Sequence, residues 1–245
     1  MADVPGKSPA SDATTDSDES VAFRFQTQPE FHEVPLGIGI EEDALDEQMR
    51  SFARDYWGDR EDWEPLRRMF AAVHTANAQQ LSSQGVVYHA LGVFPIGGTA
   101  DGAVPPERIS RCTLLVSTRE LGNSNPVVSA AGIAKALAQS NPDGEVLPVR
   151  IPAGPAVISV GASRAVWTLP DGGEQERFLV RIELWVPFPA DNRLLLFCLS
   201  TSDVDDLYRY QAILADIADT ISFGDVKRDR DVIAASAHDI GATFG

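Results

Sequence analysis

The strand predicted over residues 178–188 constrains the fold of this chain more than any other segment. Its apolar side chains occupy every second position: Phe178, Val180, Ile182, Leu184, Val186 and Phe188. The positions between them include Arg181, Glu183 and Trp185. Because successive side chains of a strand point to opposite faces of a sheet, this spacing predicts one fully apolar face. A turn at 189–192 leads to a second apolar run over 193–199, so the two segments are expected to form a hairpin.

Other strands are expected before this hairpin. Residues 86–94 and 111–117 are apolar on both faces, which is typical of central strands covered by helices. Shorter strands are predicted over 21–25, 31–36, 146–151, 156–160 and 164–169. A tight turn at Gly161-Ala-Ser163 is expected to join the last two of these strands.

Amphipathic helices are expected over 43–56, 59–81, 126–139 and in a segment that begins after Ser202, because apolar residues recur there at helical spacing. On the second helix the apolar stripe is expected to include Phe70 and Val73, with Asp59 as the N-cap. The last helix is expected to start with a capping box from Ser202 to Asp205. The first two helices are separated by a turn at Gly58, so an antiparallel pair is predicted.

Together these segments predict an α+β fold, with a mostly antiparallel sheet of six to eight strands packed against helices. Strands and helices do not alternate regularly, so a Rossmann sheet is disfavoured. Residues 21–223 are expected to form a single α+β domain. Residues 1–20 have too few apolar groups to offset the entropy of ordering, which predicts a disordered acidic tail. Residues 224–245 are expected to form a peripheral helix or a tail.

The order of elements over residues 111–223 resembles that of the PsbP-like superfamily. The resemblance rests on a strand at 111–117, a helix at 127–137, the strand Gly154-Pro-Ala-Val157, the strand Arg181-Ile-Glu-Leu-Trp-Val-Pro187 and a closing helix that runs to Phe223. It covers about half of the chain and is a match of layout, with no diagnostic motif. Members of the superfamily share an α+β sandwich and mostly act as binding or accessory proteins, and the resemblance implies the same here.

Charge excludes several classes of partner. The chain has 36 acidic and 20 basic residues, a formal net charge of -16. This excess repels phosphate backbones and anionic headgroups, so nucleic acid is not expected to bind. Residues 1–20 have no apolar run of the kind found in a secretory signal, and no segment is apolar enough to span a bilayer. We therefore expect no membrane insertion and a cytoplasmic location.

Residues with the chemistry for catalysis or metal binding are scattered along the sequence. Ser163 is one residue short of a G-x-S-x-G elbow and precedes a predicted strand instead of a helix. No short spacing typical of metal ligands occurs among the four histidines, His32, His74, His89 and His238. Histidines 74 and 89 are expected to be packing or hydrogen-bonded residues. The sequence therefore predicts no metal site.

Three other motifs have structural explanations. Gly37-Ile-Gly39 lacks the third glycine of a dinucleotide-binding loop and is followed by acidic residues. Asp205 and Asp206 are explained by the preference for carboxylates in the first turn of a helix. Cys112 and Cys198 lie in apolar runs and are expected to be buried thiols. We therefore expect no catalytic residue and no cofactor.

Two features favour a role in binding. The acidic segment Glu41, Glu42, Asp43, Asp46 and Glu47 is expected to contact a partner, together with the acidic tail. Trp185 lies on the strand face opposite the apolar row, where it either packs under a helix or marks a contact surface. The leading hypothesis is a non-enzymatic binding or accessory protein that engages a protein partner with a basic surface.

The alternative hypothesis is a small-molecule-binding protein or a hydrolase. Its pocket is expected between the sheet and the helical pair at 43–81, lined by aromatic residues such as Phe70, Tyr88 and Trp185.

Overall fold

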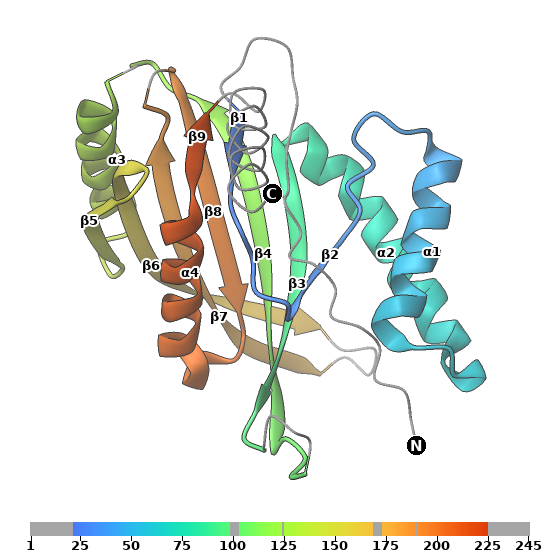
Figure 1. Ribbon diagram of the computed structural model, residues 1–245. Coiled ribbons are helices and arrows are strands. Elements are labelled where there is room, and N and C mark those ends of the chain that lie inside the picture. Colours follow the sequence, from blue (N-terminus) through green and yellow to red (C-terminus); the bar gives the residue numbers. More distant parts are fainter. Residues whose placement is uncertain (1–21, 99–102, 124, 169–172, 190, 225–245) are drawn as a thin grey trace, which may run out of the picture.

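The computed structural model describes residues 22–98, 103–123, 125–168, 173–189 and 191–224 (Figure 1). The tail expected at 1–20 and the terminal segment after Gly224 lie outside these residues. The helices are α1 (Glu42–Trp57), α2 (Glu64–Ser83), α3 (Pro126–Ser140) and α4 (Leu207–Thr220). The strands are β1 (Ala22–Arg24), β2 (Phe31–Glu33), β3 (Val86–Ile96), β4 (Arg108–Glu120), β5 (Glu145–Ile151), β6 (Gly154–Thr168), β7 (Glu174–Pro187), β8 (Arg193–Thr201) and β9 (Ser222–Gly224).

The predicted α+β class is confirmed. In the described part of the chain, an antiparallel sheet of seven strands has the order β2-β3-β4-β8-β7-β6-β5, and β1 pairs with β9 in a second, two-stranded sheet. The pairs β3–β4, β5–β6, β6–β7 and β7–β8 are consecutive in sequence, whereas β2 reaches β3 through α1 and α2, and the β4–β8 pair joins the two halves of the sheet. The hairpin predicted from the alternation in residues 178–199 is the β7–β8 pair.

One face of the sheet, the core face, carries the main hydrophobic core. Five of the six alternating apolar residues predicted over 178–188 are buried there, namely Val180, Ile182, Leu184 and Val186 of β7 and Phe188 just after it. Helix α4 packs across this face with Tyr210, Leu214 and Ile217 (Figure 1). The sixth residue, Phe178, is 51% exposed, because β8 pairs with β7 only from Val180 onward and leaves the end of the β6–β7 hairpin uncovered.

The opposite face, which we call the Trp185 face, carries helices at its two ends. Helices α1 and α2 pack together, and α2 contacts β3, whereas α3 contacts β5, β6 and β7 (Figure 1). Residues that pair directly on neighbouring strands lie on the same face of the sheet. His89 pairs with Leu115, Leu115 pairs with Cys198, and Cys198 pairs with Glu183. The side chains of His89 and Glu183 therefore lie on the same face, under different helices.

The predicted start of α2 is wrong, and its predicted stripe is right at Phe70, which packs against α1, but wrong at Val73. A short 3-10 helix, Glu61–Trp63, precedes α2, so Asp59 is not its N-cap. The residues buried on α2 are Arg67, Ala71 and Ala78, and Val73 is exposed. The buried face of α2 includes the charged Arg67, because its guanidinium donates to the carbonyl oxygens of Gly58 and Arg60 at the end of α1.

The predicted capping box of α4 is also wrong. A 3-10 turn, Val204–Asp206, precedes the helix, and no side chain caps it. Two neighbouring carboxylates are bound by β4: Asp203 accepts from the backbone N–H of Arg111 at 2.6 Å, and Asp206 accepts two hydrogen bonds from Arg108, each at 2.6 Å. The Arg108 guanidinium beside Asp206 lowers the pKa of that carboxyl from its ordinary value. Sequence reasoning could not foresee a partner 98 residues away.

The turn predicted at Gly161-Ala-Ser163 does not exist. Strand β6 is continuous and pairs with β7 from Val157 opposite Trp185 to Thr168 opposite Glu174. Asn141 approaches Gly161 closely, since a Cβ atom at Gly161 would lie 2.7 Å from Nδ2 of Asn141. The glycine therefore marks the approach of a neighbouring loop to the strand.

Candidate functional site

A hollow of about 430 Å³ lies on the Trp185 face, between the end of α3 and strands β5, β6 and β7. Small-molecule sites in proteins have volumes of about 300–1,000 Å³. The hollow is lined by Leu137, Ser140, Asn141, Val146, Ser159, Gly161, Ala162, Ser163, Arg181, Glu183 and Trp185. Ser140, Ser163 and Arg181 are exposed and mark where it opens to solvent.

The rim of the hollow is built around Asn141, the residue that ends α3. Its backbone N–H donates to the carbonyl of Leu137, and its own carbonyl accepts from Gly144, which closes the turn into β5. A Cβ atom at Gly144 would collide with the Asn141 side chain and lie 2.9 Å from the carbonyl oxygen of Val160. Asn141 is thus held between two glycines, Gly144 and Gly161, with its carboxamide at the hollow.

The floor of the hollow carries a hydrogen-bonded network around Glu183. Its Oε2 accepts from Ser159 Oγ and from Trp185 Nε1, each at 3.2 Å. Its Oε1 accepts from Arg181 at a longer distance, 3.4 Å. The Glu183 side chain is only 14% exposed, and these donors compensate the burial of its charge.

The remaining wall is apolar. Leu137 of α3 and Val146 of β5 are half-buried and face the hollow together with the indole of Trp185. Trp185 therefore lies in the region covered by α3 and lines the hollow, whereas its role as a contact surface stays a prediction. An apolar wall beside a few fixed polar groups is the usual composition of a small-molecule site.

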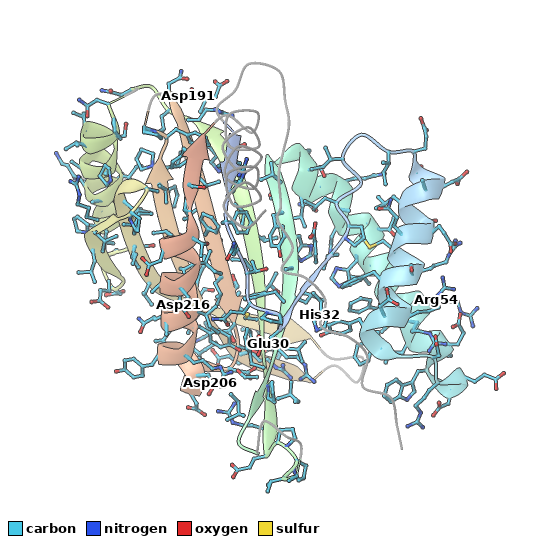
Figure 2. All side chains as sticks on the ribbon, viewed as in Figure 1. Glu30, His32, Arg54, Asp191, Asp206 and Asp216 are labelled. Atoms are coloured by element: carbon cyan, nitrogen blue, oxygen red, sulfur yellow. The ribbon has the colours of Figure 1, made fainter. Side chains whose placement is uncertain are left out.

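The predicted acidic contact segment lies elsewhere. Glu41, Glu42 and Asp43 are exposed at the start of α1, on the side of the molecule opposite α3 (Figure 1). Two further carboxylates are paired within α1: Asp46 lies 3.7 Å from Arg50, and Glu47 lies 3.4 Å from both Arg50 and Arg54. Figure 2 labels Arg54 on this outer helix, far from α3. The structure does not bring the acidic segment and Trp185 together.

The pocket predicted from Phe70, Tyr88 and Trp185 is wrong in its location. Tyr88 lies on the core face, where its ring meets that of Phe25 at 5.1 Å. Phe70 lies between α1 and the sheet and stacks on Phe52 at 5.8 Å. The three predicted residues line no common space, because they lie on two faces and under different helices.

Three histidines gather between the α1–α2 pair and strands β2 and β3. The rings of His74 and His89 lie 5.7 Å apart, and the ring of His32 lies 5.3 Å from that of Tyr56. Burial lowers the pKa of His74, and it lowers that of His89 to about 4. Within the described residues, no three or more His, Cys, Asp or Glu side chains are placed to hold a metal ion. His238 lies outside the described residues.

The cysteines are free and lie on opposite faces of the sheet. Cys112 is buried on the core face, where burial raises the pKa of its thiol to about 12. Cys198 is half-buried on the Trp185 face, and burial raises its pKa as well. Both shifts disfavour the thiolate, which is the nucleophilic form. The prediction of a buried thiol is confirmed for Cys112 and holds in part for Cys198.

No model of a known protein family matches this chain, and a search of curated proteins gave no match either. The resemblance to the PsbP-like superfamily therefore stays a prediction. In the part of the chain that the structure describes, no helix has the length and apolar character needed to cross a bilayer.

Sequence reasoning identified Trp185 and missed the other residues of the hollow. Arg181 and Glu183 had a signal, since they occupy the same strand face as Trp185. An isolated glycine in a strand pattern signals a close approach, and Gly161 was interpreted as part of a turn instead. Asn141 had no signal, because its place depends on how α3 packs on the sheet.

Two glycine substitutions are expected to have opposite effects and test the rim. Gly144→Ala should lower the free energy of unfolding by about 1–3 kcal/mol, because the new methyl overpacks against Asn141 and Val160. Gly132→Ala should raise it by about 0.5–1 kcal/mol, because Gly132 lies in α3 with no atom within 4 Å of its Cβ position. Urea unfolding measures both. A stabilising Gly144→Ala would contradict the described rim.

Proposed function

We propose that this chain is a non-enzymatic binding protein that holds a small organic molecule in the hollow beside α3. One observation carries the proposal: a network of Glu183, Arg181 and Trp185 forms the floor of a hollow that also has an apolar wall. A polar network of this kind fixes the orientation of a ligand, while the apolar wall supplies most of the binding free energy. A small-molecule-binding protein was the alternative hypothesis from the sequence. Its pocket was expected between the sheet and the α1–α2 pair, whereas the proposed pocket lies beside α3.

The lining of the hollow favours binding over hydrolysis. Hydrolysis by a serine needs an adjacent base, and a histidine usually supplies it. The residues that line the hollow include no histidine, cysteine or aspartate. Ser159 is buried, and its hydroxyl donates to Glu183, so it is directed toward the floor. Ser163 is exposed and is free to donate to a bound molecule.

A protein partner with a basic surface is the second proposal, and it concerns a different part of the molecule. Glu41, Glu42 and Asp43 are exposed together at the N-terminus of α1, and no ion pair involves them among the described residues. The paired carboxylates Asp46 and Glu47 contribute less, because Arg50 and Arg54 already compensate them. Charge reversal at Glu42 and Asp43 is expected to abolish a salt-sensitive interaction and leave the hollow unaffected.

A small-molecule screen followed by NMR tests the first proposal. Molecules that bind the wild-type protein should shift the amide resonance of Gly161 and the indole N–H resonance of Trp185. The variant Ser163→Phe should lose these shifts, because a ring at this exposed position fills the hollow. Ser202→Phe, at an exposed position outside the hollow, is the matched control and should keep them. Shifts confined to other regions, or turnover of a bound molecule, would overturn the proposal.

A further inference from the structure

The two charged residues of the hollow differ in how much of their hydrogen-bonding capacity is used. Glu183 is 14% exposed, and both of its oxygens already accept hydrogen bonds from the floor. Arg181 is 52% exposed, and its contact with Glu183 is long, at 3.4 Å. A guanidinium has five N–H donors, so most of the donors of Arg181 remain available to a ligand. The accessible charge of the hollow is therefore positive.

The sheet leaves space beside this guanidinium. Gly161 is the direct partner of Arg181 in the β6–β7 ladder and presents no side chain there. Ser200 is its direct partner on β8, and Ser163 is two residues farther along β6 on the same face. The carboxamide of Asn141 lies over Gly161. Apart from Glu183, the groups beside Arg181 are neutral, and Ser163, Ser200 and Asn141 among them can donate hydrogen bonds.

We infer that the ligand of this hollow is a small organic carboxylate with an apolar or aromatic body, and that Arg181 binds its carboxylate. The inference rests on the proposed function and specifies its ligand class. A planar guanidinium matches the two oxygens of a carboxylate, and neutral donors such as Ser163 and Asn141 complete the set. One cation suits a monoanion better than a dianionic phosphate, which usually needs several positive charges. The apolar body lies against Trp185, Leu137 and Val146.

Matched probes separate charge recognition from binding to the apolar wall. Phenylpropanoate, naphthylacetate and indolylbutyrate would be compared with their primary amides and with the corresponding amines, by NMR titration of the Trp185 indole N–H. The carboxylates are expected to bind at least about tenfold more tightly than the amides, because a hydrogen bond between two charged groups is stronger than one from a charged donor to a neutral amide. The amines are expected to bind more weakly still.

The variant Arg181→Gln should weaken carboxylate binding by about 10- to 100-fold and leave amide binding nearly unchanged. Arg177→Gln is the matched control, because Arg177 lies on the same strand and face, is exposed and is outside the lining of the hollow. Equal binding of acids and amides at the hollow would overturn the inference and leave the proposed function standing. Failure of every probe to shift the hollow resonances at millimolar concentration would overturn both.

Discussion

Replacing Phe197 with alanine is expected to lower the free energy of unfolding by about 3–5 kcal/mol. The ring is fully buried on the core face, where β8 pairs with both halves of the sheet. It packs edge to face against Phe25 at 5.1 Å, and Phe25 makes the same contact with Tyr88. Removing the ring therefore leaves a cavity at the point where the two halves of the sheet and the segment after β1 meet. Urea unfolding followed by far-UV circular dichroism measures the change.

The same deletion at Phe178 is the matched control. Phe178 is 51% exposed on the uncovered end of the β6–β7 hairpin, where the Arg164 guanidinium lies 5.2 Å from its ring centre. Phe178→Ala should change the free energy of unfolding by no more than about 1 kcal/mol. Equal losses at the two positions would contradict the core described here.

Acidification from pH 7 to pH 4 is expected to destabilise the protein by on the order of 3 kcal/mol through His89. His89 is buried under α2, and its pKa falls from the ordinary value of 6.5 to about 4, mainly because burial disfavours the charged ring. The nearby His74 lowers this pKa further. The unfolded chain therefore binds a proton that the folded protein excludes. The stabilisation is complete above about pH 6.5 and is lost progressively as the pH falls toward about 4.

A variant without the titrating ring isolates this effect. His89→Phe keeps an aromatic side chain beside His74 but cannot bind a proton. Its free energy of unfolding should fall much less than that of the wild-type protein between pH 6.5 and pH 4. Parallel pH profiles for the two proteins would show that His89 does not carry the acid sensitivity.

The parts of the fold that sequence predicted are those set by local spacing. The alternation in β7 determines its buried face without reference to any other strand, and α1 and α3 were placed within a few residues of their observed ends. The amphipathic helix expected after Ser202 is α4, and its apolar residues are buried on the core face. In each case the residues that must be buried have the period of the element itself.

The errors arose where a distant partner decides the outcome. The capping box predicted from Ser202 to Asp205 is absent because a 3-10 turn, Val204–Asp206, precedes α4, and the neighbouring Asp203 and Asp206 bind β4. The stripe of α2 was predicted only in part: Phe70 packs against α1, but Val73 is exposed, and Arg67 is buried with its guanidinium at the end of α1. The hollow could not be predicted as a site, since it depends on the register that places Gly161 opposite Arg181 and on the packing of α3 over both.

The most direct test of the central claim is a crystal structure of the protein soaked with the tightest-binding aryl carboxylate. The predicted result is a ligand whose carboxylate oxygens lie within hydrogen-bond distance of the Arg181 guanidinium and whose apolar body contacts Trp185. A ligand bound elsewhere, or one in the hollow with its carboxylate directed to solvent and away from Arg181, would contradict the account.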